Sequence, residues 1–298
     1  NNGELNKYGT TMGLMLLPFW TDGCISSMEG LFFEAAGTTP YHFITAAAMS
    51  KQSSNPVREL RYDNNDAAKG VAYMRALGVK YFMGFTPEAV TAASAQPGLI
   101  KVAQSGPWVI FRVTESDLVV PLTVQPVVVA MTSGDPRERW LEIGTSWFQH
   151  ANEWAALPAD AGPQEWQHID AKIDLTRREG EPGASGRRVD IVTPGEAIEP
   201  VALPPVVVSN IEMGQSAVSF SVDKIGVPVL VRVSYFPNWK VDGAKGPFRV
   251  APNMMVVIPT SNNIKLHYGS TSRDYMAYLL TFIGIGMLVR RRRRMRRE

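Results

Sequence analysis

The chain has 298 residues, of which 45% are hydrophobic and 19% are charged. This balance is too apolar for a disordered chain and leaves room for about two globular domains. The net charge of +2 is uneven, because residues 290–298 hold seven arginines and one glutamate; without them 23 basic side chains face 27 acidic ones.

The chain opens on NNGELNKYGTT, without a Met or a basic and apolar leader, so we expect sequence to be missing upstream. Residues 9–20 are apolar but too short to span a membrane, and Pro18 interrupts them. We expect residues 1–54 to form a membrane-proximal loop region. Cys24 excludes an intrachain disulfide because it is the only cysteine, and we expect it to be a small, at least half-buried residue.

Residues 55–113 follow the pattern of a small α/β domain. Asp66 is a predicted N-cap for the helical run AAKGVAYMRALG, and Thr86 is a predicted N-cap for TPEAVTAASAQ. The segments VKYFMGF, LIKVAQ and WVIFRV are rich in β-branched and aromatic residues. The predicted order is therefore helix, strand, helix, strand, strand.

Residues 114–200 are less regular, and we interpret them as a Trp-rich connector and linker. Trp140, Trp147 and Trp154 are seven residues apart, with Trp166 further on. One interpretation is a row of exposed rings that stacks on sugars. The favoured one is an amphipathic helix that packs its tryptophan face on a neighbour or on a bilayer surface.

Residues 201–269 contain five or six short, alternating segments separated by turn residues, a spacing that predicts a β-sandwich domain. Within it, Asp242 and Gly243 indicate a hairpin turn, with Trp239 buried beneath. Only a few residues separate this domain from the apolar tail. The predicted sandwich should therefore lie close to any membrane that the tail enters.

The segment 275–289 is a predicted transmembrane helix, and 290–298 is a basic tail. The 15 residues of the segment 275–289 span about 22 Å as a helix, whereas a bilayer core is about 30 Å thick. Tyr275 and Tyr278 suit the interface, and Arg290, Arg291 and Arg292 can snorkel to extend the reach. A buried core helix is disfavoured by the five consecutive arginines, and a nucleic-acid arm by the fused apolar helix.

Arginines resist translocation, so the positive-inside rule keeps the tail cytoplasmic and places residues 1 to about 272 outside the cytoplasm. No LPxTG-like or Pro-Glu-Pro sorting motif precedes the helix. The expected fold class is therefore α+β: a small α/β domain, then a β-sandwich domain and a C-terminal transmembrane helix, in a cell-membrane protein.

Two segments resemble a known family. They are YMRALGVKYFMGF…LIKVAQSGPWVIFRV and VRVSYFPNWKVDGAKGPFRVAPNMMVVIPTSNNIKLHYG. They resemble the outer part of YfhO-like multi-pass membrane proteins and of the actinobacterial membrane proteins labelled as 6-pyruvoyl-tetrahydropterin-synthase-related. The resemblance covers residues 1–289, most specifically 74–113 and 229–289. These proteins are similar in plan to GT-C glycosyltransferases, which take sugars from polyprenyl-phosphate carriers outside the cytoplasm.

The resemblance implies that this chain is the C-terminal outer region of such a transferase, acting in cell-envelope glycan assembly. The catalytic carboxylate of GT-C enzymes lies in their first outer loop, so it is expected upstream, and activity of this region alone is not expected. The alternative is a non-catalytic, membrane-anchored module that binds envelope polysaccharide or a partner protein. Expected partners are thus the lipid bilayer, a polyprenyl-phosphate sugar and envelope glycan, and no nucleic acid.

A carboxylate cluster in the N-terminal region is the candidate substrate site. It comprises Asp22, Glu29 and Glu34, followed by Tyr41 and His42. Such a transferase needs a carboxylate base, often with a divalent cation in the full-length protein. The alternative is a structural loop whose carboxylates cap helices or pair with cations. No cofactor or resident metal is indicated, since the four histidines are scattered and no P-loop, dinucleotide fingerprint or nucleophile elbow occurs.

Overall fold

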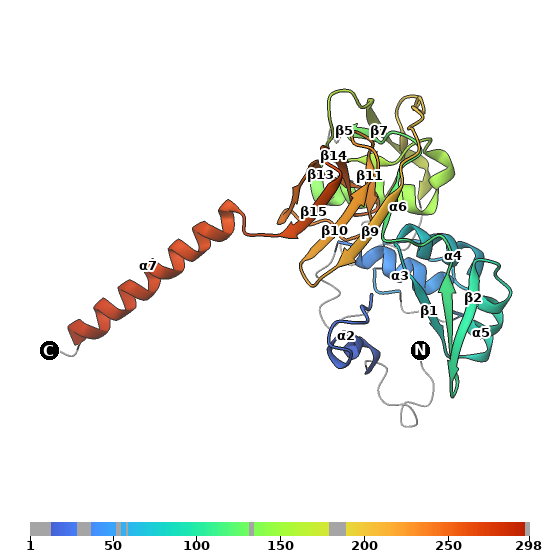
Figure 1. Cartoon of the computed structure of the whole chain (residues 1–298), viewed down its shortest axis with the longest axis horizontal. Helices are drawn as coiled ribbons and strands as arrows, with labels where there is room; N and C mark the ends of the chain where they lie inside the picture. The colour runs from blue at the N-terminus through green and yellow to red at the C-terminus, as the bar shows by residue number, and fades with distance from the viewer. Residues whose placement is uncertain are drawn as a thin grey trace.

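The computed structural model describes residues 13–28, 37–51, 55–57, 59–130, 134–178 and 189–295. It confirms a mixed α+β fold, built from three sheets and the helices around them. Figure 1 shows a folded body from which one long C-terminal helix projects. The first elements are η1 (Gly13–Leu16), α2 (Leu17–Trp20) and α3 (Thr39–Ala48).

The small α/β unit has the predicted order of elements. It consists of α4 (Ala67–Ala76), β1 (Tyr81–Gly84), α5 (Pro87–Ser94), β2 (Leu99–Ser105) and β3 (Trp108–Val113). Both predicted N-caps are confirmed: the Asp66 side chain accepts from Lys69 N, and the Thr86 hydroxyl accepts from Ala89 N. Each cap satisfies a helix N–H that would otherwise lack a partner. The strands form an antiparallel sheet in the order β1-β3-β2.

The region 114–200 is not the irregular connector that we expected. It supplies α6 (Pro136–Gln149), η3 (Ala151–Glu153) and the strands β4 (Val119–Pro121), β5 (Val127–Ala130), β6 (Pro158–Ala159), β7 (His168–Arg178) and β8 (Asp190–Pro194). All five strands join one eight-stranded sheet, ordered β4-β11-β14-β13-β6-β5-β7-β8. Most of them are too short to stand out in the sequence. β5 pairs in parallel with β6 and β7, which follow it in the chain only after α6. No short turn connects such strands, so the sequence carries no local signal for this pairing.

The tryptophans of this region are mostly buried, in agreement with the packing interpretation. Trp140, Trp154 and Trp166 are 1%, 5% and 3% exposed, and Trp147 packs partly buried against the core. The helix ends at Gln149, so Trp154 lies beyond it rather than on the same helical face. The rings are therefore core side chains, and an exposed sugar-stacking row does not form.

Residues 201–269 divide between two sheets. The strands are β9 (Val208–Met213), β10 (Ala217–Val222), β11 (Val229–Val231), β12 (Trp239–Asp242), β13 (Ala244–Val250), β14 (Met254–Pro259) and β15 (Asn263–Tyr268). Four of them form a separate sheet, β12-β15-β10-β9, while β11, β13 and β14 join the eight-stranded sheet. Buried side chains of β10 and β15 share one hydrophobic core with those of β11 and β14.

The predicted hairpin at Asp242–Gly243 is wrong, because β12 pairs with β15 whereas β13 pairs with β14. The chain passes from one sheet to the other at Gly243. That residue has a φ of +77°, and a Cβ there would lie 2.3 Å from the Asn263 carbonyl oxygen. Trp239 is only half-buried, at the margin of the core between the sheets.

The last helix, α7 (Ser272–Met295), buries none of its 24 residues. Its first turn is held by Asp274, whose Oδ2 accepts from Thr271 N at 2.6 Å and from Asn238 Nδ2 at 2.9 Å. The helix is thus fastened to the residue just before β12. By length and hydropathy, no helix in the described part of the chain qualifies as a membrane span.

Leu266→Ala should lower the free energy of unfolding by about 2–5 kcal/mol, because Leu266 is 0% exposed between the two sheets and its truncation leaves a cavity. Denaturant unfolding of the chain measures this. The matched control is Lys265→Ala on the same strand, which should change stability by at most about 0.5 kcal/mol because its side chain is exposed. Equal effects of the two substitutions would contradict the shared core.

Candidate functional site

The predicted N-terminal site is only partly covered by the described residues, since Glu29 and Glu34 lie outside them. Asp22 is exposed in the turn after α2 and has a φ of +51°. Cys24 in the same turn is exposed, contrary to our expectation. Within the described residues, no hydrogen bond or ion pair joins Asp22 to Tyr41 or His42.

Tyr41 belongs to the hydrophobic core rather than to an open cleft. It is 1% exposed in α3, and its ring meets Phe148 of α6 edge-on at 5.2 Å. Burial raises the pKa of its hydroxyl well above the usual range. His42, the next residue on α3, is half-buried beside Phe43. Tyr41 therefore helps to pack α3 on α6.

The predicted anchor residues all lie on α7. Tyr275 and Tyr278 are 63% and 54% exposed, and their rings meet edge-on at 6.3 Å. Arg290, Arg291 and Arg292 are exposed near the other end of the helix. The tyrosines lie near the start of α7 and the arginines near its end, and Figure 1 shows that α7 starts at the folded body and projects away from it.

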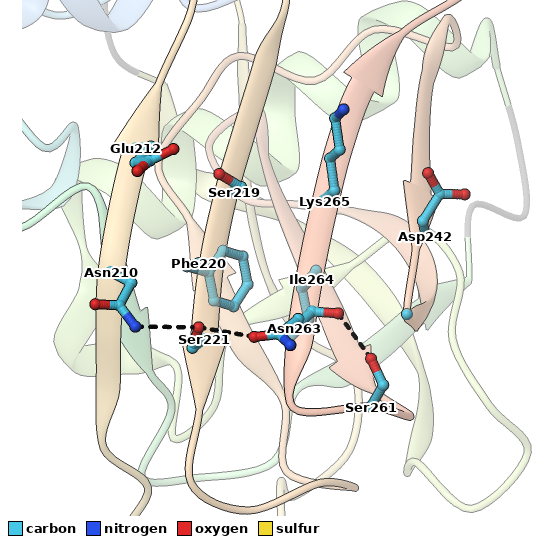
Figure 2. Close-up of a pocket in the computed structure, with 11 residues that line it drawn as sticks. Asn210, Glu212, Ser219, Phe220, Ser221, Asp242, Ser261, Asn263, Ile264 and Lys265 are labelled. Atoms are coloured by element: carbon cyan, nitrogen blue, oxygen red, sulfur yellow. Dashed lines mark hydrogen bonds between the residues drawn. The ribbon is translucent and has the colours of Figure 1, made fainter.

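A polar depression of about 390 Å³ lies on the outer face of the four-stranded sheet. Figure 2 shows its side chains projecting from β9, β10, β15 and the end of β12. Side chains alternate along a strand, so burial of Val218, Phe220 and Val222 turns Ser219 and Ser221 to this face. On β15, burial of Ile264 and Leu266 likewise turns Asn263 and Lys265 outward.

Two rows of polar side chains cross the strands in this depression. In the first row, Asn210 Nδ2 lies 3.4 Å from Ser221 Oγ, which donates to Asn263 Oδ1 at 3.0 Å. The second row runs in the order Glu212, Ser219, Lys265, Asp242. In it, each residue is the cross-strand partner of the next. The face therefore offers amide, hydroxyl, carboxylate and ammonium groups side by side.

A β-bulge in β9 places Asn210 in the first row. Pairing of β9 with β10 shifts register between Ser219 and Ser221, and Asn210 has a φ of +52° there. Asparagine tolerates this left-handed conformation better than most residues do. Bulges of this kind often re-aim a side chain near a functional site. The polar alternation in SNIEM, AVSFSV and NIKLHY is the sequence signal for this face, which the N-terminal hypothesis overlooked.

The chemistry that the depression offers is hydrogen bonding. The side chains of Phe220 and Ile264, both 2% exposed, point into the core on the other side of the sheet, so at these positions the backbone lines the depression. The outward groups are donors and acceptors in rows across the strands. In the described part of the chain, no three His, Cys, Asp or Glu residues lie close enough together to hold a metal ion. The arrangement can therefore exchange several hydrogen bonds with a polar ligand.

A second polar cluster surrounds Arg249 of β13. Its guanidinium carbon lies 4.7 Å from the Trp140 ring centroid and 5.7 Å from that of Tyr235. Arg249 Nε donates to Asn253 Oδ1 at 2.7 Å. Trp140 is fixed in turn, because its Nε1 donates to the Pro252 carbonyl at 3.1 Å. The cluster thus joins α6 to the turn between β13 and β14.

Asp160 is the carboxylic acid of this cluster. Its backbone N–H donates to the Arg249 carbonyl at 3.0 Å, since Asp160 directly follows β6, which pairs with β13. Burial raises the pKa of Asp160 to about 6, although the nearby Arg249 charge opposes the shift. Burial also lowers the pKa of Arg249. The carboxyl group therefore titrates closer to neutral pH than a solvated aspartate does.

Comparison of this chain with models of protein families, with curated proteins and with solved structures found no match. The two polar clusters and α7 therefore carry the functional inference by their own geometry.

Asp160→Asn should stabilise the chain by about 1–3 kcal/mol near pH 7.5, and by progressively less as the pH falls below 6. The raised pKa means that the folded state binds more protons than the unfolded state at pH values between the two pKa values. Stability is consequently lost as the pH rises through this range. Urea unfolding at several pH values, compared with wild type, measures the difference.

Asp170→Asn on β7 is the control, because Asp170 is exposed and its loss should change stability by at most about 0.5 kcal/mol. A loss of stability in Asp160→Asn near pH 7.5 would contradict the raised pKa.

Proposed function

We propose that this chain is the extracytoplasmic, membrane-anchored part of an integral membrane protein, and that it binds an envelope polysaccharide. The observation that carries the proposal is α7, which exposes every apolar side chain of its 275–289 stretch to its surroundings. In this proposal the four-stranded sheet packs with β11, β13 and β14 as a β-sandwich, which α7 holds next to the bilayer.

The exposure of α7 supports a lipid environment. Monomeric soluble proteins rarely leave large contiguous apolar surfaces in water. On α7, Leu280, Phe282 and Leu288 are 63%, 72% and 67% exposed, and apolar residues surround the helix. A bilayer is the partner that covers a helix on all sides, whereas a protein groove covers one face.

The apolar stretch of α7 is shorter than the hydrocarbon core, so the residues at its two ends must contribute to the span. Fifteen residues give about 22 Å against a hydrocarbon core of about 30 Å. Arginine stems can pass through the outer hydrocarbon while their guanidinium groups reach the phosphates, and local thinning accommodates the remainder. Tyr275 and Tyr278 suit the opposite interface, beside the folded body. In this proposal the positive-inside rule keeps the arginines in the cytoplasm, and the body lies outside it.

The depression supports glycan binding by the outer face of the sheet. Its amides, hydroxyls and carboxylates form rows across the strands (Figure 2), and an extended polysaccharide likewise carries its hydroxyl groups in a row along its chain. The Asn210–Ser221–Asn263 row is held by its own hydrogen bonds, so little side-chain entropy is lost on binding. The anchored sheet would meet polymers close to the membrane.

A transferase of the GT-C-like class, with polyprenyl-phosphate sugars as donors and a divalent cation in the full-length protein, is the second candidate. The resemblance of residues 74–113 and 229–289 to YfhO-like proteins supports it. The observation in its favour is Asp160, whose pKa of about 6 suits a general base near neutral pH. The main catalytic carboxylate would still lie in an upstream outer loop.

Leu280→Lys combined with Ile283→Lys should release the chain from membranes, because each lysine at the centre of a bilayer costs about 2.5–3.5 kcal/mol. The measurement is the fraction that stays in the membrane pellet after carbonate extraction. The paired control, Ile100→Lys with Val102→Lys on the exposed strand β2, should leave the pellet fraction unchanged. Wild-type chain extracted fully by carbonate would refute anchoring by α7.

Asn263→Ala should weaken binding to purified envelope polysaccharide by about 5–20-fold, because it removes a positioned amide that can bond the ligand. Affinity electrophoresis in gels containing the polysaccharide measures the change. Lys101→Ala on β2 is the control and should migrate as wild type does. Glycan binding that survives Asn263→Ala together with Glu212→Ala would contradict a site on this face.

A further inference from the structure

Arg249 is a half-buried cation without a carboxylate partner. In the described part of the chain, no carboxylate lies within the 4.0 Å of an ion pair, and the Nε bond to Asn253 is the hydrogen bond that its side chain makes. Removing a charge from water costs several kcal/mol unless it is paired. Among the described residues, no hydrogen bond occupies the donors at the end of the guanidinium fork.

We propose that the Arg249 guanidinium, held between the Trp140 and Tyr235 rings, is a binding site for an oxyanion, either a carboxylate or a phosphate carried by a ligand. The planar fork presents parallel N–H donors at the spacing of two oxygen atoms of such a group. This site is distinct from the depression on the four-stranded sheet and does not depend on glycan binding there.

The surroundings hold the fork in place before a ligand arrives. Asn253 is 2% exposed, and its Nδ2 donates to Ser234 Oγ at 3.1 Å and to the Tyr235 carbonyl at 3.2 Å. Its Oδ1 is thereby directed at Arg249 Nε. Gly37 closes over the amide, because a Cβ at Gly37 would lie 2.5 Å from Asn253 Nδ2. An arginine fixed in this way loses little rotamer entropy on binding.

Asp160 makes the proposed site sensitive to pH. The titratable groups that act on Arg249 are Asp160, Tyr41 and Tyr235, and burial raises the pKa of both tyrosines, so they stay neutral near pH 7. Asp160 is ionised above its pKa of about 6 and then repels an incoming anion. Protonation removes this repulsion, so oxyanion affinity should rise as the pH falls through about 6.

The test uses the whole chain in uncharged detergent micelles and follows the Arg249 Nε–H resonance by NMR. Inorganic phosphate and acetate should shift this resonance with saturation. Sulfate, which keeps its charge across the range, should bind on the order of tenfold more tightly at about pH 5 than at about pH 7.5, since one nearby like charge is lost. Asp160→Asn should bind as tightly at both pH values as wild type does at the lower one.

Variants separate binding from a purely structural role of Arg249. Arg249→Lys keeps the cation but loses the fork, so it should remain folded and bind at least about tenfold more weakly. Arg112→Gln removes an exposed arginine of β3 and should bind as wild type does. Sulfate affinity that is equal in wild type, Arg249→Lys and Asp160→Asn at every pH would overturn the proposal, as would a resonance that no oxyanion shifts.

Two further probes distinguish the source of the oxyanion. Glucuronate carries the carboxylate of an acidic sugar, and dihexanoyl phosphatidic acid carries a lipid phosphate. Tighter binding of glucuronate than of acetate indicates an acidic polysaccharide as the ligand. Tighter binding of the lipid than of inorganic phosphate indicates a membrane headgroup. If neither probe binds while the depression still binds glycan, this proposal fails and the proposed function stands.

Discussion

Mutual burial of two sheets is the constraint on which the rest of this structure depends. Val218, Phe220 and Leu266 from one sheet pack against Val229 and Met255 from the other. Because side chains alternate along each strand, sealing this core leaves every second residue on the outside. The polar rows of the outer face are the other half of that alternation. A slip of one residue in β10 or β15 would destroy the core and the candidate binding face together.

The same sheet system also connects the parts of the chain. The eight-stranded sheet draws strands from residues 119–194 and 229–259, and the core beneath it includes Tyr41 of α3, Tyr73 of α4 and Phe148 of α6. The small α/β unit is therefore packed on the body rather than linked to it by a free connector. This continuity explains how Trp140 and Asp160, which are remote from Arg249 in sequence, come to lie near its guanidinium group.

At the start of α7, the Asp274 side chain joins the helix to the folded body. Asn238 and Thr271 bind the same carboxylate, so the helix leaves the four-stranded sheet with its first turn fixed. If α7 lies in a bilayer, the depression and the Arg249 cluster are held at set heights above the headgroups.

The sequence by itself determined the elements whose signals are local. The caps at Asp66 and Thr86, the order of the α/β unit, and the contrast between the apolar stretch and the arginines of the tail can all be read from neighbouring residues. Tertiary structure alone decided the partners of the short strands, the crossing between sheets at Gly243, and the meeting of Arg249 with Asp160. Strand pairing and charge proximity depend on contacts between distant residues, and alternation within one strand does not specify which strand lies beside it.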